Sequence, residues 1–233
     1  MKSFFLKVIL LIILLKVMPA NLHSTNKPDS NNIKASYYSA KKEMINMLEC
    51  KAPLDFERAV FIVENAYFDN RVHYSEFKST IDFHTANIRK LINANSSLIP
   101  GVFKSDYLET AEQKRENYWK ALANWAIYTY MTDTTMFVNN DGIYYHLPYS
   151  YSFDDPFGTT DWRNTQVMKL LCSKEKKGNC FAMALLFKIF SERLKSGAMI
   201  CTAPGHIYIR KKKKKGTYYN VEPATRSFPG TGT

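Results

Sequence analysis

The chain has 233 residues, which is room for one domain or a little more. Its 45% apolar and 14% aromatic content can fill a core, and nine glycines and nine prolines exclude a collagen-like or low-complexity polypeptide. The formal charge of +11 is unevenly spread, because three lysines lie in the first 16 residues and six basic residues form the run 210–215. The rest of the chain carries only +2, so we expect no nucleic-acid partner.

Residues 1–24 have the layout of a secretory signal peptide. Lys2 precedes an apolar stretch whose longest uninterrupted piece is Val8–Leu15, and small residues follow from Ala20. The stretch is too short for a comfortable membrane span. We therefore expect an exported protein (periplasmic, cell-surface or secreted), with an uncleaved signal anchor as the alternative. The membrane would then be reached only through this leader.

The next part of the chain changes from polar to helical. Residues 25–35 are rich in Asn and Ser and are typical of a linker, whereas 36–131 form a mostly helical region of unassigned role. Asp55 is well placed to cap a helix over Phe56–Tyr67. Tyr107–Met131 is the longest candidate helix, and we interpret its aromatic stripe as core.

From residue 132 to 233 the pattern indicates an α+β core. We expect a short hairpin around 139–142, then an irregular loop in which Asp154 and Asp155 are solvated turn residues. A helix is predicted over Trp162–Cys172, followed by a basic turn over Ser173–Asn179.

The segment with the clearest chemical meaning begins at Gly178. Gly178 breaks the chain, Asn179 is a good N-cap, and Cys180 falls in the first turn of a helix that is apolar nearly all round. The partial positive charge of a helix N-terminus favours thiolate over thiol. We also expect free backbone N–H groups beside the sulfur, which can hold an oxyanion.

A nucleophilic cysteine needs a base and a group that orients the base. Strands are predicted over 198–203, 206–210 and 217–221, and a hairpin would bring His206 close to Glu222. The order helix-Cys, strand-His, strand-acid is that of a nucleophile, a base and an orienting group. By contrast, the histidines are scattered and no CxxC occurs, so we expect neither a metal nor a cofactor.

The motifs KGNC, PGHIYI and NVEPAT resemble the transglutaminase-like branch of the papain-like cysteine enzymes, and most of all exported bacterial proteins that carry this domain. The resemblance covers Trp162 to Gly230. It implies a Cys helix packed on an antiparallel sheet, with Cys180 as nucleophile and His206 as base. The family usually has Asp at the third position, whereas this chain has Glu222, one methylene longer, with Asn220 as the alternative orienting group.

The resemblance also implies an oxyanion-supporting side chain upstream, for which Trp162 and Gln166 are the candidates. The implied reaction is acyl transfer from an amide through a thioester, to water (a peptidase or amidase) or to an amine (a transglutaminase-like acyltransferase). We expect hydrolysis of a protein or peptide substrate. Since an isolated Cys on an apolar helix is often inert packing, the alternative is a non-catalytic binding or structural module that retains the fold.

The remaining features carry less chemistry. Cys172 and Cys201 lack a cap or a base partner, so we interpret them as core thiols or as a disulfide pair. The run Lys211–Lys215 is predicted to be the solvated tip of a hairpin, and a surface that binds anionic polymers or lipid headgroups is the alternative. Three strands would leave an open sheet edge, so we expect the reading frame to be incomplete.

Overall fold

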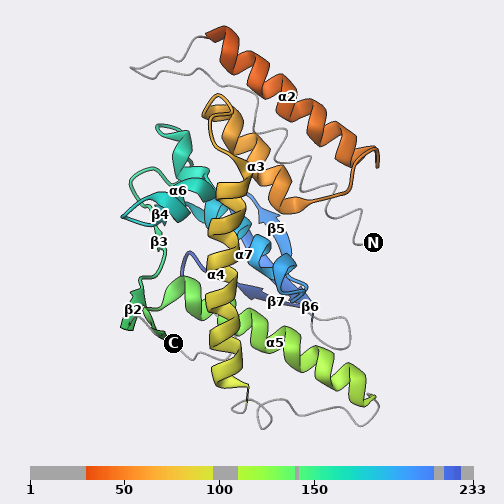
Figure 1. The fold of residues 1–233 in the computed structure, drawn as a ribbon, viewed down its shortest axis with the longest axis vertical. Coiled ribbons are helices and arrows are strands. Elements are labelled where there is room, and N and C mark those ends of the chain that lie inside the picture. Colours follow the sequence, from red (N-terminus) through yellow and green to blue (C-terminus); the bar gives the residue numbers. More distant parts are fainter. Residues whose placement is uncertain (1–29, 97–109, 140–141, 213–217, 227–233) are drawn as a thin grey trace. The chain divides into compact units, whose positions relative to one another are not determined.

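The computed structural model describes residues 30–96, 110–139, 142–212 and 218–226, which form a mixed α+β structure (Figure 1). The expected leader lies outside the described residues. The helices are α2 Ser30–Leu48, α3 Phe56–Tyr67, α4 Tyr74–Asn95, α5 Ala111–Thr132, the 3₁₀ turn η1 Trp162–Thr165, α6 Val167–Cys172 and α7 Cys180–Arg193. The strands are β1 Thr135–Asn139, β2 Gly142–His146, β3 Ser150–Tyr151, β4 Lys177–Gly178, β5 Met199–Ala203, β6 His206–Lys212 and β7 Tyr218–Val221.

The chain divides into two compact units, residues 1–79 and 80–233, and the boundary falls within α4. The sequence pattern predicts a different boundary, between a mostly helical region that ends at residue 131 and an α+β core that begins at residue 132. Helix α5 belongs to the second unit because it packs on α7, and the indole N–H of Trp119 donates to the carbonyl oxygen of Leu194 (3.0 Å).

The first unit contains α2, α3 and the start of α4. Helix α3 has the predicted bounds and the predicted cap, since the carboxylate of Asp55 accepts from the backbone N–H of Arg58 (2.9 Å). The guanidinium of Arg58 pairs with both oxygens of Glu43 on α2 (2.6 and 3.1 Å). Helix α2 begins at Ser30, inside the segment whose composition indicated a linker.

Helix α7 is the central element of the second unit. It contacts η1, α5, α6, β4, β5 and β6, and all its residues from Cys180 to Ser191 are buried. This agrees with the sequence, because a helix that is apolar all round must be covered on every side.

The sheet β5-β6-β7 confirms the three predicted antiparallel strands. Ile209 pairs with Ile200 on one side and with Val221 on the other. Since β6 contacts α7 and its side chains alternate, these buried residues face the helix. His206 and the other even-numbered residues of β6 lie on the opposite face.

The expected hairpin is also present, as β1 and β2 with Asn139 opposite Gly142. Phe137 and Tyr144 stack on its inner face with ring centroids 5.2 Å apart. The outer face is apolar and exposed; it carries Met136, Val138, Ile143 and Tyr145.

Two predictions for the segment before α7 are wrong. The helix expected over Trp162–Cys172 is divided into η1 and α6, because Gln166 between them has an extended backbone (φ −94°, ψ 136°). The turn expected over Ser173–Asn179 contains β4, which pairs in parallel with β3. Neither the break at Gln166 nor strand β4 has a local signal in the sequence. Strands β3 and β4 are brought together only by the fold.

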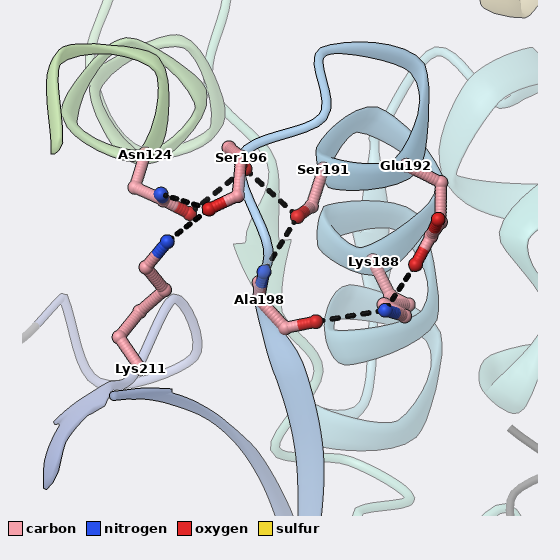
Figure 2. A network of polar contacts seen from close by, with 7 residues as sticks. All are labelled: Asn124, Lys188, Ser191, Glu192, Ser196, Ala198 and Lys211. Atoms are coloured by element: carbon pink, nitrogen blue, oxygen red, sulfur yellow. Dashed lines mark hydrogen bonds and ion pairs between the residues drawn. The ribbon is translucent and has the colours of Figure 1, made fainter. Parts of the chain in front are cut away.

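A network of polar contacts closes the C-terminal end of α7 (Figure 2). The side chain of Asn124 on α5 donates to the carbonyl oxygen of Ser196 (3.1 Å) and accepts from the Ser196 hydroxyl (3.1 Å). Oγ of Ser191 accepts from the backbone N–H of Ala198 (2.9 Å) and lies within hydrogen-bond distance of Oγ of Ser196 (2.8 Å). The ammonium group of Lys188 donates to the Ala198 carbonyl (2.8 Å) and to a Glu192 carboxylate oxygen.

Lys211 also belongs to this network, because its amine donates to the carbonyl oxygen of Ser196 (Figure 2). The prediction that this residue lies at a solvated hairpin tip is wrong: Lys211 is buried within β6, on the face turned to α7. Lys212 is exposed, as predicted, and residues 213–215 lie outside the described residues. Burial, and after it the charges of Lys120 and Lys188, lower the pKa of Lys211 to about 7.

The described helices are each too short or too polar to cross a membrane.

Candidate active site

Cys180 is the first residue of α7, as the sequence predicts. Asn179 before it has an extended backbone, and its side-chain oxygen accepts from the N–H groups of Phe181 (3.0 Å) and Ala182 (3.2 Å). The expectation of several free N–H groups beside the sulfur is therefore wrong for these two. The N–H of Cys180 itself is not taken by the cap.

The loop 155–161 fixes the N-terminal end of α7. The amide N–H₂ of Asn179 donates to the carbonyl oxygen of Pro156 (3.1 Å), and its backbone N–H donates to the carbonyl of Asn164 (2.9 Å). Gly158 lies against the same end, with a φ of +65° that favours glycine. The cap of the Cys helix is thus held from three sides.

Asp155 organises this loop and was missed by the sequence analysis, which interpreted it as a solvated turn residue. Its carboxylate accepts from the backbone N–H groups of Thr159 (2.9 Å), Thr160 (3.1 Å) and Asp161 (2.8 Å). Desolvation acts to raise the pKa of Asp155, but these hydrogen bonds together hold it below its ordinary value. The only available signal was the pair of Thr residues four and five positions downstream.

The strands bring His206 and Glu222 together as predicted. Nε2 of His206 lies 2.9 Å from Oε2 of Glu222, so the longer side chain does reach the imidazole. A carboxylate accepts only from a protonated nitrogen, which leaves the lone pair of the neutral ring on Nδ1. Asn220, the alternative orienting group, accepts instead from Nε of Arg210 (3.1 Å).

The surroundings of this pair leave it open to solvent on one side. The side chains of His206 and Glu222 are 36% and 20% exposed, so another molecule can reach the ring. The ring of Tyr208 stacks nearly parallel to that of His206, with centroids 5.8 Å apart and an angle of 16° between the planes. The imidazole is therefore held by its hydrogen bond to Glu222 and lies beside an aromatic ring.

The loop 155–161 lies next to the residues that precede Cys180 and His206. Pro156 is hydrogen-bonded to the residue before Cys180, and a ring carbon of Phe157 lies 3.6 Å from the position that a Cβ on Gly205, the residue before His206, would take. Among the hydrogen bonds of the described residues, none joins Sγ of Cys180 to the imidazole.

The pKa of the Tyr151 phenol depends in part on Cys180. Burial raises the pKa of this phenol, and the charge of a Cys180 thiolate raises it further. Tyr151 therefore lies within electrostatic reach of the sulfur, at the end of β3. Its ring makes an edge contact with the exposed ring of Phe153, at a centroid distance of 4.8 Å.

The two residues considered for oxyanion support lie on elements next to α7. Trp162 begins η1, which contacts both α7 and β4. Gln166 is 1% exposed, and within the described residues neither atom of its amide has a hydrogen-bond partner. A buried amide is costly unless a buried water or another group hydrogen-bonds to it.

The cysteines differ from the sequence-based interpretation. Cys172 is exposed on α6 and is not a core thiol, and no disulfide joins any of the four cysteines. Burial raises the pKa of Cys201, an effect that the charge of Arg210 partly offsets. No three His, Cys, Asp or Glu residues of the described ranges form a group that could hold a metal ion.

Comparison of the chain with protein-family models, with curated proteins and with solved structures finds no match in any of the three.

Proposed function

We propose that the protein is an exported cysteine hydrolase of the transglutaminase-like, papain-like kind, which forms a thioester on Cys180. The observation that carries the proposal is the 2.9 Å hydrogen bond between Nε2 of His206 and Oε2 of Glu222. This bond leaves Nδ1 as the basic nitrogen, as a general base requires. Its support is the position of Cys180 at the start of a capped helix, a position typical of reactive cysteines.

The proposed reaction proceeds in two acyl transfers. Sγ of Cys180 attacks the carbonyl carbon of an amide while its proton passes to Nδ1 of His206. The tetrahedral intermediate collapses, the C–N bond breaks, and His206 returns the proton to the leaving amine. His206 then takes a proton from water, which attacks the thioester and releases the carboxylic acid, and the proton returns to the sulfur.

The oxyanion of both intermediates needs donors close to the sulfur. The N–H of Cys180 and the buried amide of Gln166 are the donors we propose, because the cap leaves the first free and the second has no partner among the described residues. The indole N–H of Trp162 is the alternative side-chain donor.

The test is acylation by p-nitrophenyl acetate, a small activated ester that needs no substrate recognition. We expect a burst of about one p-nitrophenol per protein, with the acetyl group found on Cys180 by peptide mass. His206→Ala should reduce the burst rate at least tenfold, whereas Cys172→Ser, the matched control, should leave it unchanged. Acetylation that is absent from Cys180, or as fast without His206, would contradict the proposal.

A second candidate is a non-catalytic binding module. Two observations favour it: Cys180 is buried without a hydrogen bond to His206, and His206 lies on the sheet face opposite to the one that packs on α7. In that case the acetyl group should appear mainly on exposed thiols such as Cys172. The same experiment therefore separates the two candidates.

A further inference from the structure

The open face of the sheet carries a second polar group beyond the His206–Glu222 pair. His206, Tyr208 and Arg210 follow one another at every second position of β6. Asn220 and Glu222 stand beside them on the neighbouring chain segment. All five side chains lie on the face turned away from α7, where a second molecule can lie against the sheet.

The guanidinium of Arg210 is held in one orientation by neutral partners. Its Nε donates to Oδ1 of Asn220 (3.1 Å) and its Nη2 donates to the hydroxyl of Tyr208 (2.8 Å). The central carbon also lies over the rings of Tyr208 (5.3 Å) and Tyr218 (5.9 Å). These contacts restrict its rotamers before any ligand binds, which lowers the entropic cost of binding.

The charge of Arg210 is not neutralised by these contacts. Within the described residues it forms no ion pair, whereas Arg58 and Arg163 pair with carboxylates at 2.6 and 2.9 Å. The nearest acid on the same face, Glu222, is already bonded to His206. The two N–H groups on Nη1 therefore remain for a ligand, and a planar guanidinium is best matched by a carboxylate.

The position of Arg210 on β6 fixes its distance from His206, the base of the proposed reaction. It lies four residues from His206 along the same strand, or about 13 Å at roughly 3.3 Å per residue. An extended peptide lying along β6 covers the same distance in four residues. Lys212, two positions further on the same face, is exposed and adds positive potential at that end.

We propose that Arg210 is a specificity residue that binds a carboxylate of the substrate, three to four residues from the reacting amide. The inference rests on the proposed function, and it names the substrate class as peptides that are acidic at this position. Asp and Glu side chains and a C-terminal α-carboxylate offer the same chemistry to the guanidinium.

Binding is measured on the full chain with Cys180→Ser, so that no turnover occurs. The probes are dye-labelled peptides of Ala and Ser around a central Gln, read by fluorescence anisotropy. One series has Glu or Gln four residues before or after the centre, with an amidated C-terminus. A second series ends at that position, as a free acid or as an amide, and so separates the two sources of the carboxylate.

We expect each favoured acidic peptide to bind about tenfold more tightly than its neutral counterpart, as charge-assisted hydrogen bonds allow. Arg210→Gln should remove this preference and Arg210→Lys should keep only part of it. Lys212→Gln, which removes one charge from the same face but leaves the guanidinium in place, should reduce the preference and its salt dependence only slightly, and much less than Arg210→Gln does.

Equal affinity for the acidic and neutral peptides, including no detectable binding of either, overturns the inference. An equal loss of preference in Lys212→Gln also overturns it, because the effect would then be that of general charge. Melting curves of the variants show whether they are folded. If the proposed hydrolase function is wrong but the role of Arg210 in binding a carboxylate is right, p-nitrophenyl acetate will not acylate Cys180. The Arg210-dependent preference for acidic peptides will nevertheless persist.

Discussion

The two ends of helix α7 are built in different ways. At the C-terminal end, buried side chains satisfy the carbonyl and hydroxyl groups of the following turn, with Asn124, Lys188 and Lys211 as the donors (Figure 2). At the N-terminal end, one cap residue takes two N–H groups, while the buried amide of Gln166, just before α6, has no hydrogen-bond partner in the described part of the chain. We therefore expect the C-terminal end to contribute more to stability than the N-terminal end, where the proposed chemistry lies.

Removing an asparagine from each end tests this comparison most strongly. Asn124→Ala leaves the buried Ser196 without two of its hydrogen bonds and creates a small cavity, so we expect a loss of about 3 kcal/mol in the free energy of unfolding. Asn179→Ala removes a cap and should cost about 1 kcal/mol. Urea unfolding measures both, and an equal or reversed order would contradict the assignment of stability to the C-terminal end.

The glycines near the two ends form a second pair. Gly158 and Gly197 have similar positive φ values, +65° and +73°, but a Cβ at Gly158 would lie 2.5 Å from Cγ2 of Thr165, whereas at Gly197 the nearest atom is 4.0 Å away. We expect about 2 to 3 kcal/mol of destabilisation for Gly158→Ala and about 1 kcal/mol for Gly197→Ala.

Gly197→Ala measures backbone strain alone, because the nearest atom to its Cβ would be 4.0 Å away. Thr165→Ser removes the contacting methyl group, so it should recover part of the loss in Gly158→Ala. No recovery in the double variant would show that the clash with the Thr165 methyl group is not the cause of the loss. Thermal or urea unfolding of the three variants gives the values.

The buried amine of Lys211 predicts a pH dependence at the C-terminal end. Its pKa is about 7 in the folded protein, against 10.5 ordinarily, so between these values the unfolded chain holds a proton that the folded chain lacks. Stability should therefore fall as the pH decreases from about 10 to 7, and this contribution is constant below 7.

We expect the difference between the protein and Lys211→Met to change by about 1 to 2 kcal/mol between pH 7.5 and 9.5, measured by urea unfolding. Lys212→Met is the matched control, because its side chain is exposed, and it should follow the unmodified protein. If the free energy of unfolding of Lys211→Met changes with pH in parallel with that of the unmodified protein, the burial of the amine is contradicted.

How far the sequence could predict the structure depends on whether the signal was local. The cap at Asp55, the helix that begins at Cys180 and the pairing of the three final strands all follow from neighbouring residues, and each is confirmed. The pairing of β3 with β4 and the carboxylate of Asp155 depend on residues brought together by the fold.

Charge misled the sequence analysis in the same way. Five consecutive lysines indicate a solvated segment, but strand alternation continues into the run and turns Lys211 toward α7, where the carbonyl oxygen of Ser196 accepts from its amine. For the candidate site, His206 and Glu222 were predicted as a pair and are hydrogen-bonded. The cap at Asn179 was predicted and is confirmed, and it takes two of the N–H groups that were expected to be free beside Cys180.

The most direct measurement for the central claim is the rate at which iodoacetamide alkylates each cysteine of the folded protein at about pH 6. Exposure alone predicts that Cys172, which is exposed, reacts far faster than Cys180, which is 9% exposed. The account predicts the reverse order, because it makes Cys180 the nucleophile and His206 the base that activates it. It also predicts a loss of at least tenfold at Cys180 in His206→Ala and a smaller loss in Glu222→Gln, with Cys172 unaffected. Cys180 reacting more slowly than Cys172, or at the same rate without His206, would contradict it.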